Sequence, residues 1–225
     1  MVNMVAQDKD AVPIPAGGVT LEGDLRLPQS ARGLVVFAHG SGSSRHSPRN
    51  RFVAEVLQSA GLATLLFDLL TKEEEAEDIE TGRFRFNISL LAQRLVDATD
   101  WLKKHKETGG FNLGYFGAST GAAAALIAAA ERPDIIGAVV SRGGRPDLAA
   151  EFLPQVKAPT LLIVGGQDFT VIQLNQEAMT RLRVEKKLVI VPGATHLFEE
   201  PGALEEAARL AADWFISHPG RKTAK

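Results

Sequence analysis

The chain has 225 residues, of which 45% are hydrophobic and 23% charged, and its formal net charge is −2. This composition is typical of a globular protein, and the length suits one large α/β domain or two small ones. A charge so near zero argues against a protein that binds nucleic acid or a membrane surface. Because the chain has no cysteine, disulfides, thiolate metal sites and cysteine nucleophiles are excluded.

The N-terminal segment MVNMVAQDKDAVPIP lacks the basic start and apolar core of a signal peptide. No uncharged apolar run reaches the roughly 18 residues that a membrane-spanning helix requires. We therefore expect a soluble, cytoplasmic protein with neither a membrane nor a nucleic-acid partner. The sequence carries no indication of oligomeric state.

Short apolar runs alternate with longer amphipathic stretches along the chain. In chain order they predict strands at 19–27 and 33–39, a helix at 50–60, a strand at 62–68, a helix at 88–106, a strand at 111–116, a helix at 120–131, strands at 135–141 and 158–166, a helix at 171–182, a strand at 187–193 and a helix at 201–217. The first strand alternates and is expected at a mostly antiparallel edge, whereas the later ones are continuously apolar, as strands covered on both faces are. The acidic run at 73–80 is expected to be a solvated loop.

Alternation of this kind predicts an α/β fold, with a mostly parallel sheet of about eight strands and helices on both faces. No linker, repeat or low-complexity segment interrupts the pattern, so residues 1–225 are expected to form a single domain. In such a sheet, chemistry collects at the carboxyl ends of the strands. The loops that leave the strands are therefore the places to look for a site.

One such loop carries the sequence GASTG at 117–121, which fits the pattern G-x-S-x-G between a strand and an alanine-rich helix. In this pattern the serine lies on a sharp turn that exposes its hydroxyl. A side chain two residues before or after the serine would collide with the neighbouring backbone, and glycine avoids that collision. Ser119 is thus a candidate nucleophile. The alternative is a packing site for a small-residue helix that contains an incidental serine.

A serine nucleophile needs a base, and the base needs a carboxylate that orients it. Among the five histidines, His196 directly follows the predicted strand at 187–193, and Asp168 follows the strand at 158–166. The alternatives are that Asp168 is an N-cap of the following helix and that His196 is a solvated loop residue.

An oxyanion hole requires two donors aimed at the developing negative charge. The amide of Thr120, directly after the candidate nucleophile, is the expected first donor. The second is expected from the small-residue loop at 39–44, with Ser41 as first candidate and Gly42 as second.

In motif, strand succession and the order of Ser119, Asp168 and His196, the chain resembles the α/β-hydrolase superfamily over a core of about 19–217. It is most similar to the small dienelactone hydrolase-like branch. The resemblance implies that Ser119 is the nucleophile, Asp168 the acid and His196 the base, with Ser41 and Thr120 as oxyanion donors. Dienelactone hydrolases proper use cysteine in this motif, so the resemblance supports the fold more than their substrate. Only about 16 residues separate the strands at 135–141 and 158–166, so no cap domain is expected.

The predicted activity is that of a serine hydrolase, which cleaves small carboxylic esters or lactones through an acyl-enzyme without a cofactor or metal. Two alternatives remain. The loop Gly40-x-Gly42 with the later Asp68 imitates a dinucleotide-binding unit, although Arg45 takes the place of its third glycine. A non-catalytic binder with the hydrolase fold is the other.

Four residues are candidates for substrate recognition. Dienelactone hydrolases hold a substrate carboxylate with arginines, which implies an anionic or strongly polar substrate group bound by Arg142 or Arg85. Phe84 or Phe86 would then form an apolar wall. The alternative is that these arginines are surface charges that balance the acidic run just upstream.

Overall fold

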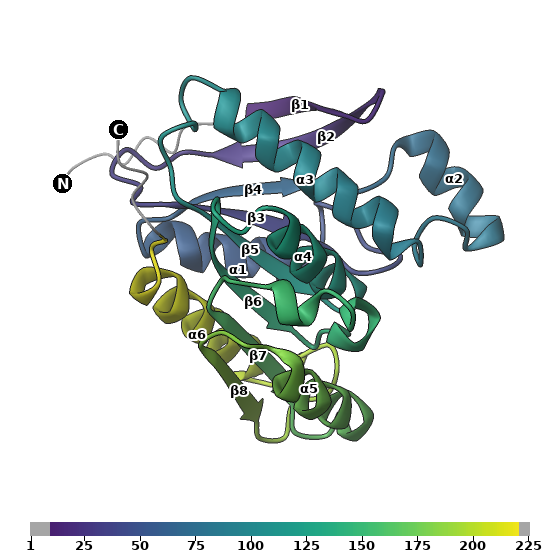
Figure 1. Ribbon diagram of the computed structural model, residues 1–225, viewed down its shortest axis with the longest axis vertical. Helices are drawn as coiled ribbons and strands as arrows, with labels where there is room; N and C mark the ends of the chain where they lie inside the picture. Colours follow the sequence, from purple (N-terminus) through teal and green to yellow (C-terminus); the bar gives the residue numbers. More distant parts are fainter. Residues whose placement is uncertain (1–9, 221–225) are drawn as a thin grey trace.

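The computed structural model contains an eight-stranded sheet with helices on both faces (Figure 1). It describes residues 10–220, so most of the N-terminal segment considered above and the last five residues of the expected domain lie outside it. The strand order is β1-β2-β4-β3-β5-β6-β7-β8. β1 and β2 pair antiparallel at one edge, and β3 to β8 are parallel to one another. The predicted fold class is thereby confirmed, including the absence of a cap domain from the described residues.

The strands are β1 Asp10–Ala16, β2 Val19–Arg26, β3 Leu34–Ala38, β4 Ala63–Phe67, β5 Leu113–Ala118, β6 Ile136–Arg142, β7 Thr160–Gly165 and β8 Lys186–Val191. The helices are α1 Pro48–Ser59, α2 Lys72–Thr81, α3 Ile88–Lys104, α4 Thr120–Glu131, α5 Phe169–Arg181 and α6 Ala203–Ser217. Two short 3-10 turns, Pro146–Ala149 and Leu153–Gln155, connect β6 to β7.

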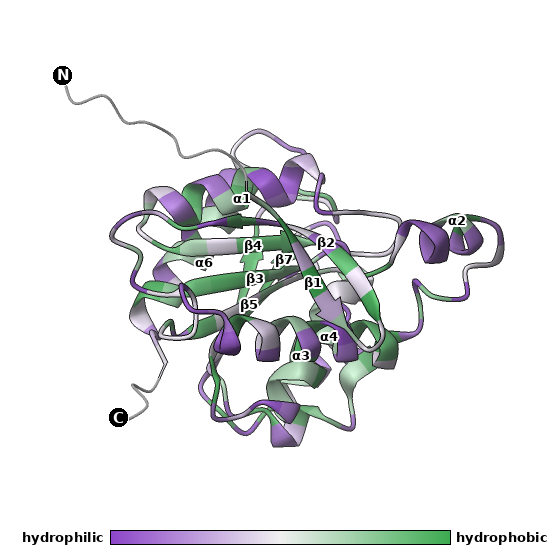
Figure 2. Cartoon of the chain, turned by 90° about the horizontal axis from the view of Figure 1, so that it is seen from above, coloured by the Kyte–Doolittle hydropathy of each residue, from purple (hydrophilic) through white to green (hydrophobic). Residues whose placement is uncertain are grey.

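The two faces of the sheet bury separate apolar clusters. Helices α3, α4 and α5 cover one face, and α1 and α6 cover the other, with the apolar strands between them (Figures 1 and 2). The alanines at 122–125 of α4 are fully buried, because their small side chains let the helix lie close to the sheet. This close approach fixes the position of the turn at which α4 begins.

Three expectations about elements were wrong. β1 was not predicted, because Pro13 and Pro15 cannot donate to a sheet; they are accommodated here at an edge, opposite β2. β8 was expected to be covered on both faces, but it is the opposite edge strand and is partly exposed.

The third correction concerns the acidic run at 73–80, which is helical rather than a loop. α2 begins with a capping box in which the Thr71 hydroxyl accepts from the Glu74 amide at 3.2 Å and the Glu74 carboxylate accepts from the Thr71 amide at 2.9 Å. The helix stands away from the main body (Figures 1 and 2). Asp78 is its one buried residue.

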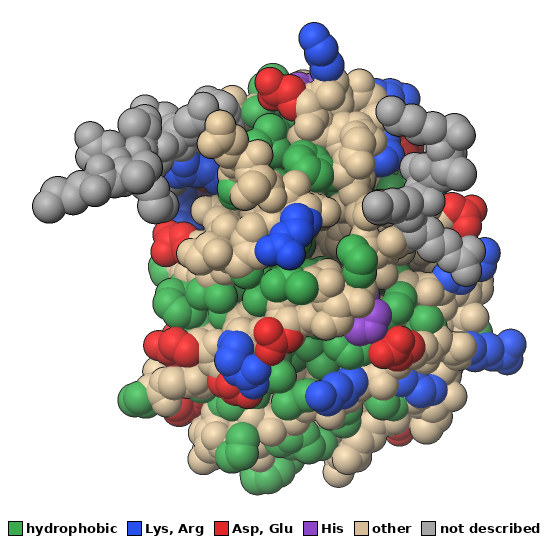
Figure 3. Space-filling view, turned by 90° about the vertical axis from the view of Figure 1, so that its left-hand side faces the viewer, with side chains coloured by type: hydrophobic (Ala, Val, Ile, Leu, Met, Phe, Trp, Pro, Cys, Tyr) green, Lys and Arg blue, Asp and Glu red, His purple; other side chains and the backbone are tan. Residues whose placement is uncertain are grey.

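No helix within residues 10–220 combines the length and apolar character that a membrane crossing needs. On the side of the molecule drawn in Figure 3, acidic and basic side chains are interspersed with apolar and neutral ones.

Candidate active site

The topology brings the loops after β3 and β5 together. β3 pairs with β4 on one side and with β5 on the other. The order of the parallel strands therefore reverses between β3 and β5, with β4 added on one side of β3 and β5 to β8 on the other. The crevice at such a switch point is where open α/β sheets bind ligands. Gly40, in the loop after β3, lies so near the loop after β5 that an added Cβ would be 3.1 Å from the Ser119 Cβ.

Ser119 occupies a strained turn between β5 and α4. Its φ of 51° and ψ of −122° are unusual for a residue with a side chain. Its amide donates to the Arg142 carbonyl at 3.2 Å, and its own carbonyl accepts from the Arg145 amide at 3.1 Å, so neighbouring backbone holds the turn. The hydroxyl makes no cap bond to the helix that it precedes. It therefore remains available for chemistry.

The two glycines of the motif are required by space. A Cβ on Gly117 would lie 2.4 Å from the Ala122 Cα, and one on Gly121 would lie 2.3 Å from the Ala38 carbonyl oxygen. Both distances are shorter than a carbon atom tolerates. Small residues on either side of Ser119 are thus a condition for the turn.

Asp168 and His196 meet at the carboxyl ends of β7 and β8. The Nδ1 of His196 donates to Oδ2 of Asp168 at 2.6 Å. Asp168 stands at the N-cap position of α5 but makes no capping bond, so the capping role considered above is wrong. Since Nδ1 is engaged, Nε2 is the ring nitrogen left for a substrate or nucleophile.

Ser119 and His196 line one cavity of about 220 Å³, which we call the catalytic cavity. Gly40, Ser41 and Ser43 contribute to its wall from the loop after β3, and Ser47 and Asn50 contribute from the start of α1. Gly143 packs against the backbone of His196, since a Cβ there would be 3.2 Å from the His196 carbonyl oxygen, and its φ of +53° favours glycine. The cavity therefore brings together Ser119 and His196, two of the three residues that the sequence predicts for acyl transfer. The third, Asp168, holds His196 through its hydrogen bond to Nδ1.

The predicted oxyanion donors are also neighbours. The Ser41 amide donates to Oγ1 of Thr120 at 2.9 Å, and the two hydroxyls lie 2.9 Å apart. Thr120 thus places its own oxygen at hydrogen-bond distance from the Ser41 amide. The sequence did not indicate this contact, because it joins side-chain and backbone groups 79 residues apart.

Arg142 is buried in the wall of the catalytic cavity, with only 7% of its surface exposed. Its guanidinium carbon lies 6.0 Å from the ring centre of Phe116 and 5.9 Å from that of Phe198, and Nη2 makes one long bond of 3.5 Å to Oδ1 of Asn50. Nε and Nη1 have no partner, and no carboxylate of residues 10–220 lies within ion-pair distance. Burial, with the nearby charge of Arg49, lowers the pKa of Arg142 to about 10, so it remains a cation at neutral pH.

The other predicted recognition residues are placed differently. Arg85 is bound to Asp78 of the acidic run, with Nε 2.5 Å from Oδ2 and Nη2 2.6 Å from the Asp78 carbonyl. Phe84 stacks beside Arg83, and Phe86 is 65% exposed. Neither ring is part of the catalytic cavity, so the expectation that they form its wall is wrong.

Asn50 is a wall residue that sequence reasoning missed. It lies in the first turn of α1, is buried, and is the only group within residues 10–220 that bonds to the Arg142 guanidinium. A buried asparagine near a helix start leaves no distinguishing pattern in the sequence. The described residues contain no group of three His, Asp or Glu side chains placed to hold a metal ion.

Comparison with known proteins gives a consistent pattern. The model of the dienelactone hydrolase family matches residues 21–217. A dienelactone hydrolase crystal structure from Anabaena variabilis is 61% identical, covers 94% of this chain and 98% of its own, and superposes with a TM-score of 0.93. Est1E from Butyrivibrio proteoclasticus is 18% identical, covers 92% and 98% of the two chains, and has a TM-score of 0.78, a likeness of fold.

Two relatives from strains of Mycobacterium tuberculosis are 59% identical over 209 residues, and both are named "Putative phosphoribosyl transferase". The match covers 93% of this chain but 46% of theirs. The chain therefore spans less than half the length of these relatives.

Proposed function

Because this chain belongs to the dienelactone hydrolase family, we propose that it is a serine hydrolase that cleaves carboxylic esters or lactones through an acyl-enzyme. The observation that carries the proposal is the 2.6 Å bond between His196 and Asp168, beside the cavity that Ser119 also lines. A histidine held by a carboxylate through Nδ1 has the tautomer and orientation needed to accept a serine proton at Nε2.

The reaction then follows from the chemistry of these groups. Ser119 Oγ attacks the ester carbonyl while its proton passes to Nε2 of His196, and the carbonyl oxygen becomes an oxyanion. As the carbon–oxygen bond to the leaving group breaks, His196 returns the proton to that oxygen. Water next attacks the acyl-enzyme with His196 again as base, which releases the acid and regenerates the serine.

The oxyanion is stabilised by the amides of Thr120 and Ser41 in this mechanism. Each amide is a neutral donor that needs no reorganisation when charge develops. The Thr120 hydroxyl, which accepts from the Ser41 amide at 2.9 Å, is replaced there by the substrate oxygen. That replacement requires only a rotation of the threonine side chain about χ1.

Arg142 supports a preference for substrates with an anionic group. A buried guanidinium without a carboxylate partner is costly, and a bound anion would offset that cost. Its Nε and Nη1 have no partner within residues 10–220, so donors remain for a carboxylate or phosphate to accept from. Of the two arginines considered from the sequence, Arg142 is the one that we retain, because Arg85 is bound to Asp78.

Other functions are less well supported by the site. The parallel strands lie in the order β4-β3-β5-β6-β7-β8. In a dinucleotide-binding sheet the third parallel strand lies next to the second, on the side away from the first. Here β5, the third parallel strand, lies next to β3, the first. A pure binder would have no use for an oriented histidine beside a strained serine. The activity in the name of the mycobacterial relatives is not proposed for this chain, because the match covers 46% of their length.

The test uses a short activated ester such as p-nitrophenyl acetate. Ser119→Ala and His196→Ala should each lower turnover on the order of 10³-fold or more, because the serine hydroxyl is a poor nucleophile without its base. EDTA should leave the rate unchanged. Activity of Ser119→Ala within a few-fold of wild type would exclude the proposal.

A further inference from the structure

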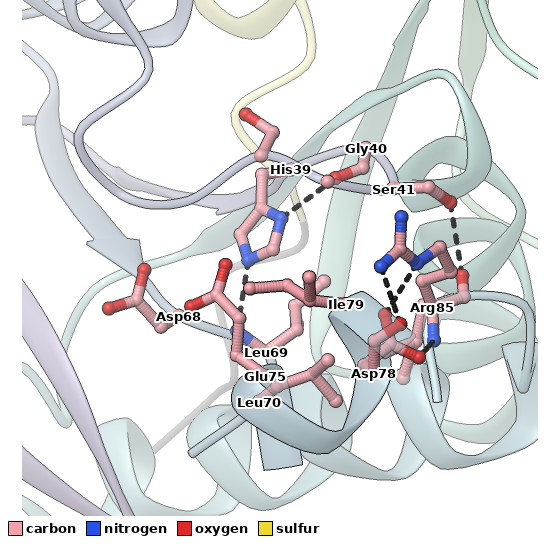
Figure 4. Close-up of a pocket in the computed structure, with 13 residues that line it drawn as sticks. His39, Gly40, Ser41, Asp68, Leu69, Leu70, Glu75, Asp78, Ile79 and Arg85 are labelled. Atoms are coloured by element: carbon pink, nitrogen blue, oxygen red, sulfur yellow. Dashed lines mark hydrogen bonds and ion pairs between the residues drawn. The ribbon is translucent and has the colours of Figure 1, made fainter. Parts of the chain in front are cut away.

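A second, larger cavity adjoins the catalytic cavity. It encloses about 320 Å³ between the loop after β3, the end of β4, and α2 and α3, and we call it the α2 cavity (Figure 4). It shares Gly40, Ser41 and Ser43 with the catalytic cavity. A substrate whose carbonyl lies at Ser119 could therefore extend one arm past this loop and into the α2 cavity.

Much of the α2 cavity wall is apolar. Leu69 and Leu91, which line it, are buried, and Ile79, on α2, has 73% of its surface exposed. An exposed isoleucine at the edge of a cavity gains stabilisation when a ligand covers it.

α2 itself is held to the rest of the molecule by ion pairs. Glu74 bonds to Arg94 at 2.8 Å, Asp78 to Arg85 at 2.5 Å and Lys72 to Glu22 at 2.6 Å. The described helix buries no apolar side chain. The apolar surface that α2 presents to the cavity is therefore not covered by the protein and can contact a ligand.

Glu75 supplies the unbalanced charge of this wall. Asp68 pairs with Arg45, and Asp78 pairs with Arg85, whereas the half-buried Glu75 carboxylate has no hydrogen bond or ion pair within residues 10–220. Glu75 extends from α2 toward the ring of His39 (Figure 4).

The neighbouring His39 does not neutralise this carboxylate. Its Nδ1 donates to the Gly40 carbonyl at 3.0 Å and its Nε2 accepts from the Leu69 amide at 3.0 Å, an arrangement that requires the neutral ring. Burial lowers the pKa of His39, which agrees with that form. Glu75 therefore faces the cavity with a carboxylate that no cation within residues 10–220 pairs.

We propose that the α2 cavity is a second substrate subsite, which binds an apolar arm of the ester that ends in a hydrogen-bond donor, a hydroxyl or an ammonium group, at Glu75. The inference rests on the proposed ester hydrolase activity. The two cavities then distinguish the ends of the substrate, since Arg142 faces one cavity with a positive charge and Glu75 faces the other with a negative one.

The experiment compares kcat/KM for esters that share one reactive bond and carry a hexyl-length arm on the acyl or on the alcohol side. The arm ends in methyl, hydroxyl, ammonium or carboxylate, and an acetate ester without an arm serves as the reference. In one of the two series the wild type should hydrolyse the hydroxyl and ammonium esters at least tenfold better than the carboxylate ester.

Variants of Glu75 separate the two donors. Glu75→Leu should lose both preferences, whereas Glu75→Gln, whose amide oxygen still accepts, should lose the preference for ammonium and keep most of that for hydroxyl. Glu80→Gln, on the exposed side of the same helix, should behave as wild type.

The acetate ester distinguishes the two possible failures. If the wild type cleaves acetate but Glu75→Leu leaves the order of arms unchanged in both series, the subsite is refuted and the hydrolase is not. If the acetate ester is not cleaved by the wild type, the proposed hydrolase activity itself has failed.

Discussion

Gly121→Ala is the smallest change that should disable the proposed nucleophile. The new Cβ would lie 2.3 Å from the Ala38 carbonyl oxygen and 2.4 Å from that of His39. Ordinary contact begins near 3.4 Å, so α4 and the end of β3 must separate by about 1 Å. Both groups are backbone, so no side-chain rotation can relieve the overlap.

Two effects set the size of the stability change. Overpacking costs about 3 kcal/mol, at the upper end of the usual range, because two rigid carbonyls are involved. Alanine is the better helix former by about 1 kcal/mol, which offsets part of that cost. We expect the free energy of unfolding to fall by about 2 kcal/mol, a loss that leaves most domains folded.

Catalysis should suffer more than stability. The separation moves Ser119 away from the loop that carries Ser41, and a misplacement of about 1 Å can reduce the rate 10²-fold. The assays are kcat and KM on p-nitrophenyl acetate, together with urea unfolding.

Gly110→Ala is the matched control, because a Cβ there meets nothing within 4 Å. It should alter stability by less than about 0.5 kcal/mol and leave the rate unchanged. If Gly121→Ala kept wild-type kcat and stability, the steric account of the elbow would be refuted.

Four further predictions concern charged groups of the candidate site and of α2. Asp168→Asn should lower kcat by about 10³- to 10⁴-fold with little change in KM, since the histidine loses its orienting carboxylate; a loss under tenfold would contradict this role. Arg142→Gln should raise KM for an anionic ester about tenfold and spare a neutral isostere, whereas Arg85→Gln should treat both esters alike; equal effects of Arg142→Gln on the two esters would exclude anion binding. The same preference should fade in the wild type as pH approaches 10, because the pKa of Arg142 is lowered to about 10. Asp78→Asn should speed amide exchange across residues 72–86, and the difference from wild type should close in acid. Burial raises the pKa of Asp78, but bonds from the amides and guanidinium of the following loop outweigh it, so the folded pKa is lowered. The stabilisation that ionised Asp78 gives to this segment is therefore complete above its unfolded pKa of about 4, and it is lost as pH falls through the folded pKa. A difference between Asp78→Asn and wild type that persisted at low pH would contradict this account.

The nucleophile turn was predictable because its determinants are local. Gly117, Ser119, Gly121 and the alanines that follow lie within one short stretch, and each must be small or exposed for a steric reason that the sequence displays. Asp168 and His196 could be selected because both follow predicted strands. Their 2.6 Å bond could not be foreseen, because it depends on how β7 and β8 pair.

The features that escaped prediction depend on contacts between distant segments. β1 is stabilised by pairing with β2 despite its prolines. The burial of Arg142 results from rings and an amide that come from three other parts of the chain. α2 is different, because its capping box, a threonine followed three residues later by glutamate, is a local sequence signal that the interpretation of the acidic run as a loop left out.

The most direct test of the central claim is rapid-quench mass spectrometry during hydrolysis of p-nitrophenyl acetate. The account predicts an acetyl group on the peptide that contains Ser119, formed at about one per chain before the steady state and absent from Ser119→Ala. Turnover of the ester by Ser119→Ala at the wild-type rate, or an acetyl group on another residue that forms and decays at the catalytic rate, would contradict it.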